Sequence, residues 1–129
     1  MRLVFGEKDA PYEEARVVVL PVPYDLSLSF LPGARRGPEA ILLASRELEP
    51  FLLELGAAPE EVGIHAAEPV PWVAGMAEES HRLIREEALK HLRAGKWLVA
   101  LGGDHSVTHP LVQAHREALG EFSLLHVDA

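Results

Sequence analysis

Two short clusters of residue types that can ligate metal ions each follow an apolar segment of the chain. The first is Gly102-Gly103-Asp104-His105-Ser106, and the second is His126-Val127-Asp128. Imidazole nitrogens and carboxylate oxygens are good ligands for Mn, Zn or Fe. A glycine pair after a buried strand also lets the backbone turn sharply and approach a ligand closely. The chemistry that these residues allow is therefore a metal-dependent reaction.

Each cluster also has a purely structural interpretation. Asp104 or Ser106 can cap a helix that begins after the glycine turn, and no lysine follows the glycines as it does in a phosphate-binding P-loop. Residues two apart in a strand face the same way, so His126 and Asp128 share one side. They could equally be a buried histidine and an exposed aspartate. Two such clusters at neighbouring strand ends favour a shared metal site.

Continuous apolar runs predict the strands that position these clusters. The runs at residues 16–22, 96–101 and 122–127 predict buried strands, as is typical of a parallel sheet. The pattern allows a further short strand around residues 62–64. Ligands bind at the carboxyl ends of such strands. Both clusters lie at carboxyl ends.

Helical spacing of apolar residues predicts helices between the strands. These helices span about residues 39–49, 77–94 and 108–119, and Pro38 lies in the first turn of the first of them. The crossover before residues 122–127 is long enough for a βαβ unit, which is right-handed almost without exception. The order of elements therefore predicts an α/β fold, an open parallel sheet with helices on both faces.

Composition limits the partners and the location of the protein. The 129 residues are 48% hydrophobic, enough for one domain with a core. The net charge of −8 argues against nucleic acid as a partner and suits a small cationic molecule. The chain has no cysteine, which excludes thiolate sites and predicts a cytoplasmic protein. We recognise no signal peptide and no apolar run of the ~20 residues that span a membrane.

The remaining histidines and the two tryptophans are expected to have structural or surface roles. The histidines are His81, His91 and His115 on exposed helix faces, His65 in a loop without an obvious partner, and His109 near a helix start, where we expect capping or surface exposure in preference to the rim of the site. Trp72 and Trp97 are expected in the core.

The whole pattern resembles the ureohydrolase family, which includes arginases and agmatinases. Residues 102–106 resemble the first metal-binding motif of that family, and residues 126–129 resemble the opening of its Asp-Ala-His-x-Asp motif. Residues 21–25 and 32–41 are similar to the N-terminal loop of agmatinases more than to that of arginases. The resemblance covers nearly the whole chain.

The resemblance implies a three-layer α/β/α sandwich with a mainly parallel sheet, of which residues 1–129 are the N-terminal portion of a single domain. It implies two Mn²⁺ ions that activate water for hydrolysis of a guanidino compound. His105 is implied to bind one ion, and Asp128 to bridge both. Asp104 and His126 are implied to support these ligands without binding metal. The resemblance assigns no further catalytic or substrate-binding residue here.

Within the family we expect agmatine as the substrate and a homo-oligomer as the assembly. Arginase, guanidinobutyrase and formiminoglutamase activities are the alternatives inside the family. The chain stops at Ala129, before the next histidine of the second motif. We therefore expect the N-terminal part of a longer agmatinase-like enzyme, inactive alone.

Two alternatives lie outside that expectation. The first is a short non-catalytic module for binding or assembly that keeps the first half of the fold and whose exposed sheet edge is covered by a partner. The second is a two-metal phosphoesterase. Residues 21–25 contain no Asp-x-His, so the sequence disfavours the phosphoesterase.

Overall fold

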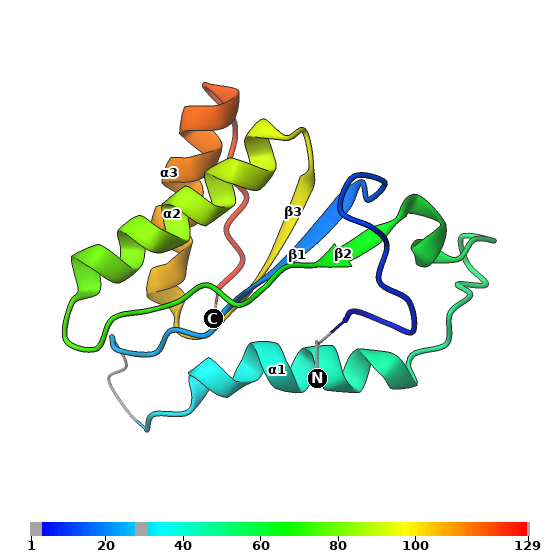
Figure 1. Ribbon diagram of the computed structural model, residues 1–129, viewed down its shortest axis with the longest axis horizontal. Helices are drawn as coiled ribbons and strands as arrows, with labels where there is room; N and C mark the ends of the chain where they lie inside the picture. The colour runs from blue at the N-terminus through cyan, green and yellow to red at the C-terminus, as the bar shows by residue number, and fades with distance from the viewer. Residues whose placement is uncertain (1–3, 28–30, 129) are drawn as a thin grey trace.

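A parallel three-stranded sheet forms the centre of the computed structural model, which describes residues 4–27 and 31–128 (Figure 1). Its strands are β1 (Val17–Val22), β2 (Ile64–Ala66) and β3 (Trp97–Gly102), in the order β2-β1-β3. Val17 pairs with Ile64 on one side and with Trp97 on the other. All three carboxyl ends therefore lie at the same edge of the sheet.

Helices cover both faces of this sheet and make three layers (Figure 1). Helix α1 (Gly37–Ala44) covers one face, and it continues as the 3-10 helix η2 (Ser45–Glu47). Helices α2 (Ala77–Arg93) and α3 (Thr108–Leu119) pack together on the other face. The predicted α/β class with helices on both faces is confirmed. The remaining 3-10 helices are η1 (Ala34–Arg36), η3 (Pro59–Val62) and η4 (His105–Val107).

The core lies on both faces of β1 because successive side chains of a strand point to opposite sides. Leu20 and Val22 pack with buried residues of α2 and α3, among them Ile84. Val19 points the other way and packs with Leu42 of α1. This two-sided burial explains why the strand is apolar without alternation.

The apolar segment at residues 122–127 forms no strand in the part of the chain that the structure describes, so that prediction is wrong for this structure. Leu125 and Val127 are 88% and 86% exposed. A strand needs a hydrogen-bonded neighbour, and this segment does not pair with the free side of β3. Trp97, expected in the core, is 76% exposed, because it lies on the face of β3 opposite to Leu98 and Ala100, which pack against the core. Trp72 is partly buried against the core.

Two histidines lie in other surroundings than the sequence predicts. His91 was expected on an exposed face and is 2% exposed. It shares a helix face with Ile84 and Ala88 through the spacing of 84, 88 and 91. His65 was expected in a loop and lies in β2, where its Nδ1 is 2.9 Å from the carbonyl oxygen of Ala10. The short strand expected around residues 62–64 is therefore displaced by about two residues.

His81 and His115 are half-buried, and each has a neighbour, so the expectation of solvated side chains is wrong for both. The ring of His81 lies 5.4 Å from that of Tyr24. His115 Nδ1 is 2.8 Å from the carbonyl oxygen of Leu111, one helical turn earlier. His109 is exposed, as one of its expected placements predicts.

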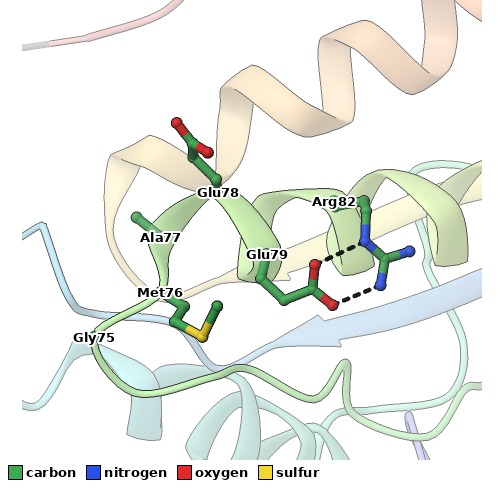
Figure 2. A pocket seen from close by; sticks show the side chains of 6 residues that line it. All are labelled: Gly75, Met76, Ala77, Glu78, Glu79 and Arg82. Carbon is green, nitrogen blue, oxygen red and sulfur yellow. Dashed lines mark hydrogen bonds and ion pairs between the residues drawn. The ribbon is translucent and has the colours of Figure 1, made fainter.

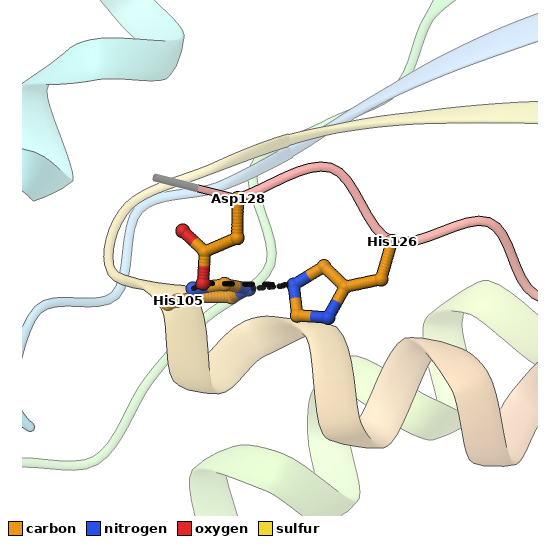
Figure 3. Close-up of side chains that lie close together, drawn as sticks. All are labelled: His105, His126 and Asp128. Atoms are coloured by element: carbon orange, nitrogen blue, oxygen red, sulfur yellow. Dashed lines mark hydrogen bonds and ion pairs between the residues drawn. The ribbon is translucent and has the colours of Figure 1, made fainter.

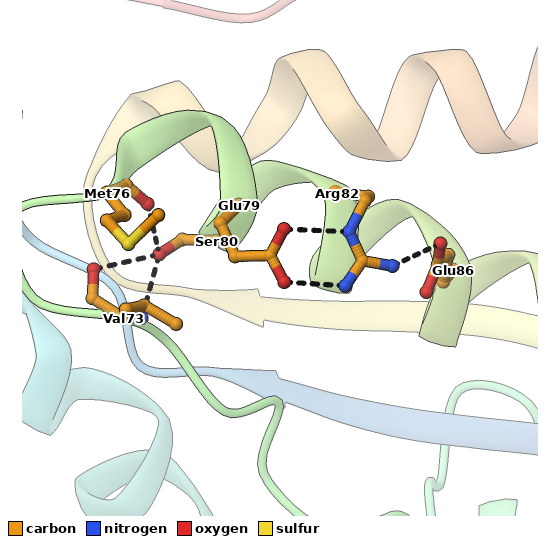
Figure 4. A network of polar contacts seen from close by, with 6 residues as sticks. All are labelled: Val73, Met76, Glu79, Ser80, Arg82 and Glu86. Carbon is orange, nitrogen blue, oxygen red and sulfur yellow. Dashed lines mark hydrogen bonds and ion pairs between the residues drawn. The ribbon is translucent and has the colours of Figure 1, made fainter.

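Polar contacts fix the beginning of α2 (Figure 4). The Ser80 hydroxyl oxygen accepts a hydrogen bond from the Val73 N–H at 2.9 Å, and this ties the preceding loop to the first turn. On the exposed face of α2, Arg82 pairs with Glu79, one turn before it, and with Glu86, one turn after it. Among the described residues no helix is both long and apolar enough to cross a membrane.

The buried position of His91 predicts a pH-dependent stability. Burial lowers the pKa of His91, Lys90 and His65 add to this effect, and Glu87 opposes it. The unfolded chain, with an imidazole pKa of about 6.5, therefore binds this proton more tightly than the folded chain does. The stability that neutral His91 allows is present above that value and is lost as the pH falls below it.

We expect His91→Gln to reduce the loss of unfolding free energy between pH 7 and pH 5, measured by urea denaturation. His109→Gln, at an exposed position, is the matched control and should keep the wild-type pH dependence. Equal pH dependence in wild type and His91→Gln would contradict the assignment.

Candidate metal centre

The candidate site lies where the chain leaves the adjacent strands β1 and β3. Gly103 donates its N–H to the Val22 carbonyl oxygen at 3.1 Å, and Asp104 donates its N–H to the Tyr24 carbonyl oxygen at 2.7 Å. A Cβ atom on Gly103 would lie 1.9 Å from that Tyr24 oxygen. Only glycine therefore allows the two backbones to come this close.

Asp104 is buried in this turn, and its carboxylate is fully engaged. One oxygen accepts hydrogen bonds from the Ser106 N–H and hydroxyl, at 2.9 and 2.5 Å. The other accepts from the Ser27 N–H and hydroxyl, at 3.0 and 2.8 Å. Burial pushes the pKa of Asp104 upward, but these bonds outweigh burial and hold that pKa below its ordinary value. Asp104 caps η4, as the structural interpretation of the motif predicted.

His105, the next residue, turns outward and meets two side chains from the end of the described chain (Figure 3). His105 Nε2 is 3.1 Å from His126 Nε2. Asp128 Oδ2 is 3.8 Å from His105 Nδ1 and 3.9 Å from His126 Nε2. All three side chains are more than half exposed. The structure thus brings together three of the four predicted site residues and turns Asp104 away from them.

This cluster fits a metal ion by its chemistry and its spacing. One ligand atom from each of His105, His126 and Asp128 lies within 4.8 Å of the other two. Two imidazoles and a carboxylate suit a divalent transition ion such as Mn²⁺. Ligand atoms about 2 Å from a shared ion lie about 3–4 Å apart, so small movements would let the three close around one ion. A second ion needs further donors.

Asp25 organises the loop after β1, a role that the sequence did not predict. Asp25 is buried, and its carboxylate accepts the Gly33 N–H at 2.9 Å and lies 3.6 Å from the Arg35 guanidinium. That guanidinium also lies over the ring of Trp72, at 5.7 Å from its centre. The sequence signals were the position of this aspartate just after a strand and its place in residues 21–25, which resemble the N-terminal loop of agmatinases. Residues 28–30 of the same loop, and Ala129 of the second motif, lie outside the described residues.

Tyr24 and His81 form the inner wall behind the glycine turn. Tyr24 is 2% exposed, and its pKa is raised by burial and by the negative charge of Asp104. His81 Nε2 lies 3.5 Å from the Ser106 hydroxyl. The turn that carries His105 is therefore packed against the strand end on one side and against α2 on the other.

A shallow depression of about 490 Å³ at the start of α2 is separate from the candidate metal centre (Figure 2). Arg82 donates two hydrogen bonds to Glu79 there, so the Glu79 carboxylate is already engaged. No predicted ligand lines it, and we assign it no site. Its lining consists of Gly75, Met76, Ala77, Glu78, Glu79 and Arg82.

Sequence comparison with known proteins points to one family. The sequence model described as the arginase family matches residues 15–129. The chain is 97% identical, over 129 residues, to the N(1)-aminopropylagmatine ureohydrolase of Thermus thermophilus. This match covers 100% of the chain and 44% of that relative. The chain therefore spans less than half the length of the curated relative.

Solved structures agree with the sequence comparison. A hypothetical agmatinase from Burkholderia thailandensis superposes with a TM-score of 0.78 at 31% identity, over 85% of this chain and 36% of that one. A Trypanosoma cruzi formiminoglutamase solved with Mn²⁺ has a TM-score of 0.75 at 24% identity, over 84% of this chain and 37% of that one. The second likeness shows the shared fold alone, and it confirms the predicted three-layer architecture.

The contact between Gly103 and Tyr24 gives a direct test of the site's framework. Gly103→Ala places a methyl group against backbone that cannot move aside, so we expect the unfolding free energy to fall by on the order of 3 kcal/mol, near the upper end for overpacking. Gly37→Ala is the matched control, because its Cβ would lie 3.4 Å from the Gly102 carbonyl oxygen and its φ is −55°. Chemical denaturation measures the unfolding free energy of both variants. A wild-type value for Gly103→Ala would contradict the close approach of the two backbones.

Proposed function

Because this chain belongs to the arginase family, we propose that it is the N-terminal portion of a Mn²⁺-dependent ureohydrolase, which releases urea from a guanidino compound. The observation that carries the proposal is the convergence of His105, His126 and Asp128 at the carboxyl edge of the parallel sheet. These side chains belong to the two motifs that resemble the family's metal-binding motifs. The three donor side chains by themselves support only metal binding. The reaction type is proposed from the family membership.

The substrate we propose is N(1)-aminopropylagmatine, with agmatine as the second candidate. The relative that is 97% identical carries the longer compound in its name. At this identity the residues present here differ little between the two proteins. Both compounds are polycations, and the net charge of −8 favours their approach. This proposal replaces agmatine, the substrate expected from the resemblance of the loop after β1, with a longer compound.

His105 and Asp128 are the proposed metal ligands. Bound Mn²⁺ would supply a nucleophile at neutral pH by lowering the pKa of water. That chemistry is needed because a guanidinium is stabilised by resonance and water attacks it poorly. Asp104 holds the backbone of His105 in place. His126 is proposed to support the ligands, although its distance from both also suits direct binding.

Other expectations from the sequence remain proposals at this point. They are a homo-oligomer, a cytoplasmic location, and a small-molecule partner instead of nucleic acid. A short non-catalytic module is the competing function, and it predicts a protein that releases no urea. The open edge of β3 with exposed Trp97 is the feature that this alternative would assign to a partner.

Removing a ligand tests the metal assignment. With the protein prepared at the length of its 97% identical relative, His105→Ala should weaken Mn²⁺ binding at least about 100-fold, since even an outer partner of a ligand can contribute that much. Asp128→Asn should be worse if Asp128 bridges two ions. Metal content after dialysis is the measurement, with His109→Ala as the control at a nearby exposed histidine. Full occupancy in both ligand variants would contradict the assignment.

The substrate assignment is tested by urea release. The same full-length protein should release urea from N(1)-aminopropylagmatine with a higher kcat/KM than from agmatine. Arginine and formiminoglutamate serve as controls. A higher kcat/KM for agmatine would restore the shorter substrate, and Mn²⁺-loaded protein that releases no urea from any of them would favour the non-catalytic module.

A further inference from the structure

We propose that Ser27 is a positioning residue for the metal centre, because it holds the Asp104 carboxylate and thereby fixes the turn that presents His105. The inference rests on the proposed function in one respect, namely that His105 binds the metal. Ser27 lies after β1, 77 residues before Asp104 in the chain. Neither cluster that the sequence singled out contains it.

The geometry of the Asp104 carboxylate gives the two serines different roles. Ser106 binds one oxygen and lies two residues away in the same turn, so its bonds stay with the turn wherever the turn moves. Ser27 binds the other oxygen with both its N–H and its hydroxyl. Its bonds therefore set the position of the turn relative to the end of β1.

The strength of this contact follows from charge and burial. The hydroxyl of Ser27 donates to an ionised carboxylate at 2.8 Å, and charge-assisted bonds are roughly twice as strong as neutral ones. Asp104 is 6% exposed, so water cannot readily replace a lost donor. Without the hydroxyl, this oxygen keeps only the Ser27 N–H as a donor from the segment after β1, and the Asp104 side chain is held less firmly. The backbone of His105, which is the next residue, moves with it.

The backbone hydrogen bonds of the turn do not by themselves fix the position of the His105 side chain. The Asp104 N–H binds the Tyr24 carbonyl oxygen and fixes the point where the turn begins. His105 lies one peptide further along, at the start of η4, and more than half of its side chain is exposed. Little packing therefore restrains the imidazole. Its placement depends on the direction in which the Asp104 side chain anchors the chain.

The test compares Ser27→Ala with Ser27→Thr in the full-length protein. Alanine removes the hydroxyl and keeps the N–H bond, whereas threonine keeps both, and the exposed Ser27 position leaves room for the added methyl group. Ser45→Ala is the matched control, because the buried Ser45 hydroxyl accepts from the Gly6 N–H and donates to the Leu42 carbonyl oxygen, away from the glycine turn. Mn²⁺ affinity is measured by equilibrium dialysis, the Mn²⁺ environment by electron paramagnetic resonance, and stability by thermal unfolding.

We expect Ser27→Ala to weaken Mn²⁺ binding about 10–100-fold, the range seen when an outer partner of a ligand is lost. Its resonance spectrum should differ from that of the wild type, and Ser27→Thr should restore both properties. Ser45→Ala should lower the melting temperature with wild-type Mn²⁺ affinity. A Ser27→Ala protein with wild-type affinity and spectrum would overturn the proposal, as would a loss of affinity that Ser45→Ala reproduces.

These outcomes are distinct from a failure of the proposed function. A wild-type protein that binds Mn²⁺ but releases no urea refutes the hydrolase, while the Mn²⁺ comparison still decides the role of Ser27. A wild-type protein that binds no Mn²⁺ refutes the metal centre and the positioning role together.

Discussion

The contact between the Gly103 backbone and the Tyr24 carbonyl is the constraint on which the candidate site depends. Two parallel strands end side by side, and the chains leaving them must diverge without leaving buried amide groups unpaired. The glycine lets one backbone lie against the other. The N–H groups of Gly103 and Asp104 donate to carbonyl oxygens at the end of β1 and just after it. The carboxylate and imidazole side chains that follow therefore start from a fixed point.

Buried carboxylates then organise the two loops that leave this point. Asp104 joins its own turn to Ser27, and Asp25 joins the loop after β1 to Gly33 and Arg35. Burial alone would raise the pKa of a carboxyl group, and for Asp104 the donors around it reverse that effect. The negative charge is kept because hydrogen bonds replace the lost hydration. Surroundings of this kind would hold in place an exposed side chain such as that of His105, the proposed ligand.

The two parts of the candidate centre are held with unequal firmness. His105 follows a turn tied to β1 and packed against α2, whereas His126 and Asp128 lie on a segment whose residues are exposed throughout. Beside that segment, β3 has one hydrogen-bonded neighbour among the described strands and presents exposed Trp97 and Val99. Pairing of a further strand with this edge would supply hydrogen bonds to the open backbone.

Sequence pattern is enough to predict the α/β class, the parallel strands β1 and β3, the helices between them and the residue types of the candidate metal cluster. Local pattern suffices for these, because periodicity and turn residues act within a few positions. The fold, and not local sequence, sets the exposure of Trp97 and residues 122–127, the burial of His91, and the hydrogen bonds of Asp25 and Ser27. Each depends on a neighbour distant in the chain, or on the lack of one. A segment with strand composition becomes a strand only when another strand pairs with it.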